Sequence, residues 1–267
     1  MSILSILSII LPDTMNTYGT WTLFLKETRR FMAVLVQTVL TPVITALLYL
    51  LVFGHVMDER FEIYAGVSYT AFLIPGLIMM SVIQNAFANT SSSMTQSKIM
   101  GNLVFVLMSP LSAFELFIAY IGAAVLRAAM VAVGLYAVGW LIVPLPLAHP
   151  VFVLAMLVLA SAALGVLGLI GGIVADKFEH LSAFQNFFIM PLSFLSGVFY
   201  SIHSLPPPWR ELSHYNPFFY MIDGFRYGFF GVGDAAPWLS LLVVGGFTLA
   251  VSLACLGMLQ SGYKLRP

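Results

Sequence analysis

The sequence predicts an all-α integral membrane protein with six transmembrane helices. Of the 267 residues, 60% are apolar and only 8% are charged, whereas soluble domains carry about 25% charged residues. Six stretches are long and apolar enough to cross a hydrocarbon core about 30 Å thick. A spanning segment must satisfy its own backbone hydrogen bonds, so we expect each stretch to be helical. The predicted spans are residues 31–56, 69–89, 113–143, 150–175, 184–203 and 237–260.

The few charged residues exclude one class of partner and orient the spans. Lys plus Arg and Asp plus Glu each number 11, so no net positive field is available to bind nucleic acid. Cytoplasmic flanks of spanning helices retain Lys and Arg. With both termini in the cytoplasm, seven cations lie inside and three outside, and Arg127 falls within the third span. The inner cations are Lys26, Arg29, Arg30, Lys98, Lys177, Lys264 and Arg266, and the outer cations are Arg60, Arg210 and Arg226.

The residues before the first span predict an interfacial helix. Residues 1–11 are apolar with no Lys or Arg ahead of them, unlike a secretory signal, and we expect an uncleaved cytoplasmic lead-in. The next residues place apolar and charged side chains on different sides of a helix, which suits the headgroup plane. Alternatively, these cations are simply the basic flank of the first span. The apolar side holds Trp21, Phe24, Leu25, Thr28 and Met32, and the charged segment holds Lys26, Glu27, Arg29 and Arg30.

The connection between the second and third spans predicts a short cytoplasmic helix. Residues 91–112 begin with a Ser-rich stretch, continue with a helical pattern around residues 95–107, and reach Pro110 as a breaker. The head of this segment is too polar to span, and its tail is too apolar to be a free loop. A helix on the cytoplasmic face that offers side chains to a soluble partner satisfies both halves. Alternatively, residues 103–108 begin the third span.

The connection between the fifth and sixth spans is rich in aromatic residues. Residues 199–230 include 11 of them, where the chain-wide 14% predicts about 4.5. Tyr and Trp favour the headgroup level, and non-spanning backbone at that depth must pack against protein or line a wet cavity. The segment predicts either an aromatic belt that anchors the protein or an outer gate for amphiphilic molecules. The gate candidates are Trp209, Tyr215, Phe218, Phe219, Tyr220 and Arg226.

Two ionisable residues lie in the third predicted span. Glu115 comes five residues after Pro110, near the helix N-terminus, where the helix dipole favours a carboxylate, so we expect a structural role. Arg127 lies near the middle of the span, where a charge that faces lipid would cost at least about 3 kcal/mol. It is therefore expected to face a partner helix, a carbonyl or water, either as a tie between helices or as part of a polar lining.

Small residues recur along the fourth predicted span at spacings of four, three and four. Small side chains let helix backbones approach closely in lipid, where van der Waals packing drives association. We expect a packing role, against another span of this chain or against a second copy. These residues are Ser161, Gly165, Gly168 and Gly172.

The sequence contains no motif for catalysis, cofactor binding or metal binding. No Gly-Lys dipeptide occurs, so the chain has no P-loop to hold ATP phosphates. It also contains no H-E-x-x-H or G-x-S-x-G motif, and its five histidines have no ligand-like spacing. Acidic residues are nearly absent from the spans, whereas carriers driven by protons or sodium use intramembrane carboxylates. An ATP-driven transport function would therefore need a separate chain that hydrolyses ATP.

Four stretches of the chain resemble the membrane subunit, or permease, of ABC-2 type transporters. The resemblance extends over nearly the full length and includes especially the small bacterial inner-membrane permeases that group with nodulation-factor exporters. The stretches are KETRRF (residues 26–31), FLIPGLIMMSVI (72–83), KIMGNLVFVLMSPLS (98–112), and PLSFLSGVFYSIHSLPPPWRELSHYNPFFYMIDGFRYG (191–228).

The resemblance implies a non-catalytic permease subunit of an exporter in the bacterial inner membrane. It would pair with a second permease copy, as a homodimer, and with two ATPase subunits that bind ATP and Mg. Residues 26–30 would form the connecting helix and residues 206–227 would belong to outer re-entrant helices. The coupling helix that docks on the ATPase would hold Lys98, Ile99, Met100, Gly101 and Asn102.

The sequence leaves the substrate and two rival classes open. An amphiphile, a lipid-linked glycan and a drug-like molecule all suit the resemblance. The alternatives to an ATP-driven permease are an ATP-independent secondary transporter and a scaffold that moves nothing. In each case we expect one domain, with a lead-in and interfacial helix over residues 1–30, a six-span bundle over 31–260 and a cytoplasmic tail over 261–267.

Overall fold

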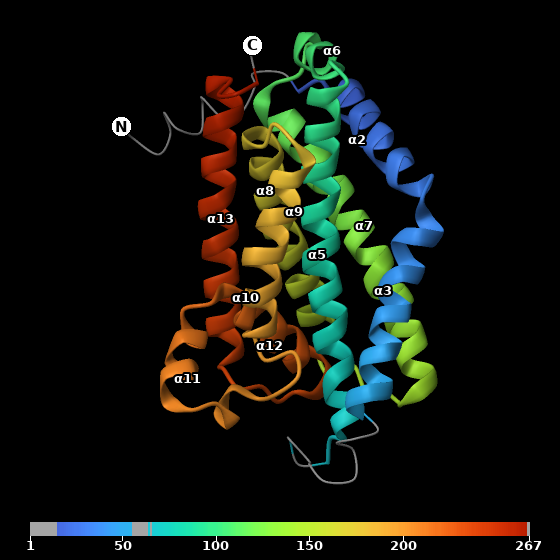
Figure 1. Cartoon of the computed structure of the whole chain (residues 1–267), viewed down its shortest axis with the longest axis vertical. Coiled ribbons are helices and arrows are strands. Elements are labelled where there is room, and N and C mark those ends of the chain that lie inside the picture. Colours follow the sequence, from blue (N-terminus) through green and yellow to red (C-terminus); the bar gives the residue numbers. More distant parts are fainter. Residues whose placement is uncertain (1–14, 55–63, 65, 266–267) are drawn as a thin grey trace.

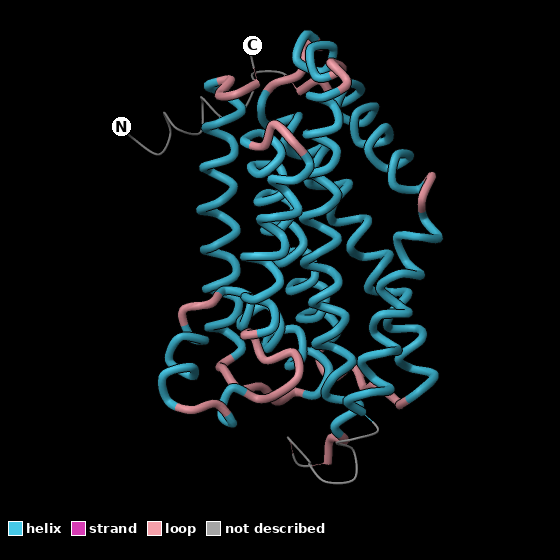
Figure 2. The backbone as a smooth tube through the Cα atoms, viewed as in Figure 1, coloured by secondary structure: helices cyan, strands magenta, loops and turns pink. Residues whose placement is uncertain are grey.

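The computed structural model describes residues 15–54, 64 and 66–265, and most of this part of the chain is helical. Its only strand-like feature is an isolated bridge between Tyr64 and Val67. Long helices run side by side along the long axis, and shorter helices cover both ends (Figures 1 and 2). The predicted lead-in before residue 15, and the cations Arg60 and Arg266, lie outside the described residues.

Five described helices are long and apolar enough to cross a membrane, and they match five of the six predicted spans. Each has a mean hydropathy of 1.7 or more. Helix α3 is extended by one π-helical turn, η1, which ends at the last residue described before the gap. The spans are α3 with η1 (Leu35–Tyr49 and Leu50–Gly54), α5 (Tyr69–Ile99), α7 (Ala113–Ile142), α8 (Pro150–Val174) and α13 (Pro237–Ser261).

The predicted span over residues 184–203 is wrong in both of its bounds. The chain forms a shorter helical run of α9 (Phe178–Phe184), η2 (Gln185–Ile189) and α10 (Met190–Phe194). Pro191 does not interrupt it. The wide π turn of η2 comes just before the proline, whose ring would clash with a carbonyl of a regular α-helical turn. The run ends near Gly197, which has a φ of +75°, a conformation that glycine adopts without strain.

The N-terminal helix is separate from the first span. Helix α2 (Thr17–Met32) ends at a turn over residues 33–34, and α3 starts beyond it, so the predicted start of the span at residue 31 is four residues early. The side of α2 that packs into the bundle carries Leu23, Glu27 and Phe31. On the predicted apolar side, the two end residues Trp21 and Met32 are exposed. The exposed Trp21 and Met32 side chains could contact lipid.

The connection predicted to lie on the inner side is a helical extension, a turn and a short helix. Helix α5 continues ten residues past the predicted end of the second span, to Ile99, and α6 follows over Leu103–Met108. Residues 109–112, which include Pro110, separate α6 from α7. The alternative in which residues 103–108 begin the third span is therefore wrong. Figure 1 shows α6 at the same end of the bundle as the start of α2 and the end of α13.

Helices α5 and α8 are in close contact, as the small residues of the fourth span predict. Thr90 Oγ1 donates a 2.6 Å hydrogen bond to the Gly165 carbonyl oxygen. A side chain at Gly168 would overlap the Phe87 carbonyl oxygen and Thr90, and a Cβ at Gly172 would lie 2.6 Å from the Cβ of Met94. The partner that the sequence left open is thus a span of the same chain.

Gly168→Ala should destabilise the bundle by about 1–3 kcal/mol, since an added methyl group forces a backbone shift at a tight contact. Gly246→Ala is the matched control, because a Cβ at Gly246 on α13 meets nothing within 4 Å. Unfolding by SDS titration measures both variants. Equal stability of the two variants would contradict the close contact between α5 and α8.

Two short helices follow at the end opposite α6. They are α11 (Pro207–His214) and α12 (Pro217–Phe230), and a 3-10 turn, η3 (Ile202–Ser204), precedes them. Helix α12 packs against α5, α8 and α13. Gly231, with a φ of +70°, ends α12. This arrangement places the aromatic segment at the end of the bundle opposite α6 (Figure 1).

Candidate functional site

A polar cavity of about 410 Å³ lies among α3, α5, α7 and the η2–α10 run. Its position beside three spans makes it the strongest candidate for a substrate site. Apolar residues such as Leu77, Met80 and Met190 share its walls with polar ones. None of the described residues that line it is acidic. The polar lining includes Gln37, Thr38, Thr41, Ser81, Gln84, Asn85, Gln185 and Arg127.

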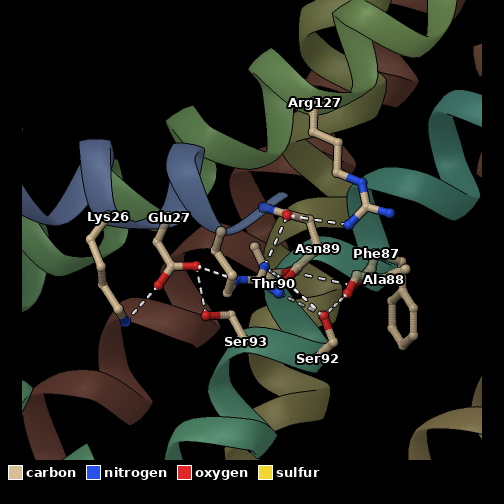
Figure 3. Close-up of polar contacts among 10 residues, drawn as sticks. Lys26, Glu27, Phe87, Ala88, Asn89, Thr90, Ser92, Ser93 and Arg127 are labelled. Carbon is tan, nitrogen blue, oxygen red and sulfur yellow. Dashed lines mark hydrogen bonds and ion pairs between the residues drawn. The ribbon is translucent and has the colours of Figure 1, made fainter. Parts of the chain in front are cut away.

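Arg127 reaches from α7 to α5 at the edge of this cavity. Its Nη2 donates to Asn85 Oδ1 at 3.2 Å, and its Nη1 lies 3.5 Å from Asn89 Oδ1. Figure 3 shows the Arg127 guanidinium pointing toward α5. Its Nε is buried and has no hydrogen-bond partner among the described residues. The two predicted roles therefore coexist, because Arg127 both ties α7 to α5 and lines the cavity.

A buried carboxylate connects α2 to the same part of α5. Glu27 is fully buried and accepts from Lys26 Nζ at 2.8 Å, Arg30 Nε at 3.1 Å and Ser93 Oγ at 2.6 Å. Arg30 also donates through Nη2 to the carbonyl oxygen of Asn89 at 2.7 Å and to its Oδ1 at 3.0 Å. Figure 3 shows Glu27, Ser93 and Asn89 along this line of contacts. Arg30 thus turns into the bundle instead of joining an exposed basic face.

Glu115 fixes the start of α7 to the start of α2. Its side chain accepts from the backbone N–H of Ser112 at 2.7 Å while Ser112 Oγ accepts from the Glu115 N–H, which completes a capping box. The same carboxylate accepts from the backbone N–H of Asn16. Because its oxygens are used for capping, Glu115 has a structural position at the helix N-terminus.

Lys98 is an anchor within the bundle and does not project toward a partner. Its Nζ donates to the carbonyl oxygens of Ile173 at 2.9 Å and Ala175 at 2.8 Å, at the C-terminus of α8, where a cation is favoured. It also lies 3.3 Å from Asp176 Oδ1. The hydrogen bond from Lys98, followed by the charge of Lys264, lowers the pKa of the Asp176 carboxyl.

The residues after Lys98 are exposed at the end of the molecule. Ile99, Met100 and Asn102 are exposed, and Gly101 turns the chain with a φ of +72°. Helix α6 then presents Val104, Phe105 and Met108 to the exterior, while Leu103 is buried. Of the five predicted coupling residues, four therefore form an accessible surface and Lys98 holds that surface in place.

The predicted outer gate residues are divided by the fold. Trp209 on α11 and Tyr215 just after it are exposed. Phe218, Phe219, Tyr220 and Arg226 are buried in α12. The four buried residues therefore cannot line an open passage in this conformation.

Arg226 lies in a polar cluster that sequence reasoning missed, at the end opposite α6, and we call it the outer cluster after the predicted topology. Its guanidinium carbon lies 3.7 Å from the centre of the Phe72 ring, and its Nη2 donates to the carbonyl oxygen of Gly197 at 2.9 Å. One turn earlier, Asp223 accepts from the backbone N–H groups of Asp234 and Ala235.

Asp234 continues the cluster to the segment before α5. It accepts from Tyr64 Oη at 2.9 Å, Ser201 Oγ at 2.8 Å and the Ile202 N–H at 2.9 Å. Burial, partly offset by the charge of Arg226, raises the pKa of the Tyr64 hydroxyl. No local pattern joins these residues, because they come from four separate segments.

Comparison with known proteins assigns the chain to a family. Residues 18–230 match the ABC-2 type transporter family. This match includes all of α2 but its first residue, the residues that line the cavity, α6 and most of the outer cluster. The chain belongs to the ABC-2 type transporter family. Members of this family work in general with an ABC ATP-binding partner.

Several ABC-2 type relatives carry names that describe transport. The chain is 41% identical over 241 residues to the inner membrane transport permease YadH of Escherichia coli (strain K12), which covers 90% of this chain and 94% of the relative. It is 30% identical over 188 residues to the capsule polysaccharide export inner-membrane protein CtrC of Neisseria meningitidis serogroup B, and this alignment covers 68% of this chain and 69% of CtrC. It is 23% identical over 163 residues to nodulation protein J of Rhizobium leguminosarum bv. viciae, and this alignment covers 60% of this chain and 62% of that protein.

The polar residues around Arg127 in this ABC-2 type chain also escaped sequence reasoning. Asn85, Asn89 and Ser93 recur at intervals of four along α5, so they lie on one side of the helix. This spacing was the available signal. The spacing is hidden when the second span is expected to end at residue 89, because Ser93 then falls in the connection.

Proposed function

We propose that this chain is the permease subunit of an ATP-driven exporter in the bacterial inner membrane. It forms the translocation path and couples to a separate ATP-binding subunit. The observation that carries the proposal is the surface formed by Ile99, Met100 and α6, which is exposed, partly apolar and directly continuous with the long span α5. Such a surface suits a soluble partner, as the resemblance to ABC-2 type permeases implies for the ATPase.

The positions of the cations support an orientation with α6 in the cytoplasm. Lys98, Lys177 and Lys264 flank the inner ends of α5, α8 and α13, whereas Arg210 and Arg226 belong to the short helices at the opposite end. Retention of Lys and Arg on the cytoplasmic side favours this assignment. In the proposed topology the α9–η2–α10 run is a sixth crossing and both termini are cytoplasmic.

The uncovered helix faces support assembly with a second copy. Beside the cavity, α3 exposes Val36, Leu40 and Leu47, and η2 exposes Phe187 and Phe188. These faces belong to two elements that also supply residues to the cavity wall. We propose that a homodimer, with two ATPase subunits, encloses the path between the two cavities.

The contacts of α2 and α5 provide a mechanical link in this proposal. ATP and Mg are bound by the partner ATPase, and closure of its two copies would displace α6 and α2 together. The α6 movement passes directly into α5. The α2 movement reaches α5 through Glu27, Ser93 and Arg30, near the level of Arg127. Rigid-body movement of the spans would then open the path alternately to the two sides.

Changing the exposed turn should uncouple the two subunits. In the double variant Met100→Glu and Asn102→Glu, two carboxylates replace exposed residues at the proposed contact, so the fold should persist while docking is lost. We expect ATP hydrolysis by the partner ATPase in proteoliposomes to lose its stimulation by the permease, by about tenfold or more. The measurement is ATPase activity with and without the permease.

Leu147→Glu is the control for a carboxylate added at the membrane surface. Leu147 is exposed in the connection between α7 and α8, at the end opposite α6, and this variant should stimulate the ATPase normally. Full stimulation by the Met100 and Asn102 double variant would contradict the coupling assignment. Transport that persists without any ATPase would favour a secondary transporter.

The names of the relatives do not agree on one substrate, so the proposed substrate is a class of molecules and not one compound. The name of CtrC refers to capsule polysaccharide export and the name of nodulation protein J to nodulation, whereas YadH is named only as a transport permease. An amphiphile, a lipid-linked glycan and a drug-like molecule all remain within the proposed function. The walls of the cavity, with polar and apolar residues together, suit an amphiphilic molecule.

A further inference from the structure

The cavity contains a cation that has no carboxylate partner. Arg127 contacts the amide oxygens of Asn85 and Asn89, which are neutral. Among the described residues, no Asp or Glu forms an ion pair with it. Its buried Nε also has no hydrogen-bond partner in the described part of the chain. A charge within a membrane protein is expensive unless it is paired, so this guanidinium can accommodate an anion.

The nearby carboxylate is already fully used. Glu27 binds Lys26, Arg30 and Ser93. The group formed by Glu27 and the three cations Lys26, Arg30 and Arg127 therefore carries two more positive than negative charges. Arg30 holds Asn89 Oδ1 at 3.0 Å, while Arg127 is 3.5 Å from the same oxygen. The electrostatic surroundings of the cavity near Arg127 are consequently positive.

We propose that Arg127 binds a phosphate group of the transported substrate. The planar guanidinium matches the geometry of phosphate oxygens and can bind two of them at once. Gln185 on the cavity wall supplies an amide donor, and Leu77 and Met80 supply apolar contacts for an attached chain. The cavity volume of about 410 Å³ falls in the range typical of small-molecule sites. The inference rests on the proposed function, because the cavity must lie on the path.

Binding of a short phosphate amphiphile to the purified full chain tests the inference. Hexyl phosphate is titrated into the permease in maltoside micelles and followed by calorimetry, with inorganic phosphate and hexanol as parallel probes. Wild type should bind hexyl phosphate, and Arg127→Gln should bind it at least about tenfold more weakly. Lys177→Gln is the matched control, because Lys177 is exposed at the inner surface, and it should bind as wild type does.

A second variant keeps the test decisive if Arg127→Gln fails to fold. Asn85→Asp places a carboxylate at the position that already contacts Arg127, with almost no change of volume. The new carboxylate should compete for the guanidinium, so hexyl phosphate binding should fall at least about tenfold while the melting temperature does not decrease. An Arg127 that serves only as a tie between helices would give no loss of binding in this variant.

The three probes distinguish the source of the phosphate. Tighter binding of hexyl phosphate than of inorganic phosphate supports an amphiphilic substrate, and equal binding supports free phosphate or a very polar ester at the same subsite. The inference is overturned if wild type does not bind hexyl phosphate, if hexanol binds equally well, or if both variants bind like wild type. Stimulation of the partner ATPase is measured on the same wild-type preparation. If the permease stimulates the ATPase but does not bind hexyl phosphate, only this inference is overturned. If the permease does not stimulate the ATPase, the proposed function is contradicted.

Discussion

Glu27→Gln should destabilise the protein by about 3 kcal/mol, the low end of the cost of breaking a buried ion pair. Glu27 is fully buried and accepts hydrogen bonds from Lys26, Arg30 and Ser93. The amide keeps the shape of the side chain but removes the negative charge that stabilises the partly buried Arg30. The cost lies at the low end of this range because the Arg30 side chain is 26% exposed. In the variant, Arg30 also keeps its hydrogen bonds to Asn89. SDS-induced unfolding in micelles measures the change.

A double variant and an exposed glutamate control this prediction. Glu27→Gln combined with Arg30→Gln should recover at least about 1 kcal/mol relative to the sum of the single changes, because the two side chains are in contact. Glu179→Gln on α9, where the side chain is exposed, should change stability by less than about 0.5 kcal/mol. Strict additivity of Glu27→Gln and Arg30→Gln would show that the ion pair between these two side chains, which both lie on α2, contributes nothing to stability.

Arg226→Met should have a similar effect at the outer end, about 3 kcal/mol of destabilisation. The change removes the contact with the Phe72 ring and the hydrogen bond to Gly197. A cation stacked on a desolvated ring contributes about 2 kcal/mol, and a hydrogen bond from a charged group adds about 1.5–3 kcal/mol, less the cost of burying the charge. Asp223 would also lose the nearby positive charge. The same unfolding titration applies.

Arg210→Met provides a comparison within the same outer segment. Arg210 also donates to two carbonyl oxygens, those of His203 and Leu205, but its surroundings are less buried. We expect a loss below about 1 kcal/mol. Arg226→Lys should remain clearly less stable than wild type, since an ammonium group lacks the planar fork. Equal effects of Arg210→Met and Arg226→Met would indicate that burial of Arg226 contributes nothing.

The sequence predicts the five long spans because each has continuous high hydropathy, although it misplaces the start of α3 by four residues and the end of α5 by ten. The position of Glu115 after Pro110 predicts its structural place at a helix N-terminus, and the small residues around Gly168 predict a close helix contact. These features depend on neighbours in the sequence. The run from residue 178 to 194 was misplaced, because a π turn that accommodates Pro191 leaves no signal in hydropathy.

The charged contacts within the membrane could not be predicted from helix faces. On α2, the end residues Trp21 and Met32 of the predicted apolar side are exposed, while the buried side carries Glu27. In lipid, apolar side chains are stable on either side of a helix, so hydrophobic periodicity does not identify the protein-facing side. The partners of Glu27 and Arg127 come from distant helices. Only the fold brings them together.

Composition also failed to separate exposed aromatic residues from buried ones. The outer segment is enriched in aromatic residues throughout, yet Tyr215 is exposed and Phe219 is buried. The difference arises because α12 packs against three spans while α11 stays at the edge. An outer gate would therefore have to involve the exposed pair Trp209 and Tyr215, or a movement of α12.

Labelling of a single cysteine on α6 tests the central claim most directly. The native Cys255 is buried, so a membrane-impermeant thiol reagent should report mainly on a new cysteine at Phe105→Cys, where the native side chain is 73% exposed. We predict labelling in inside-out vesicles, no labelling in intact cells whose outer membrane is permeabilised, and protection when the partner ATPase is bound. Labelling of Phe105→Cys from the outer side, or equal labelling with and without the ATPase, would contradict the account.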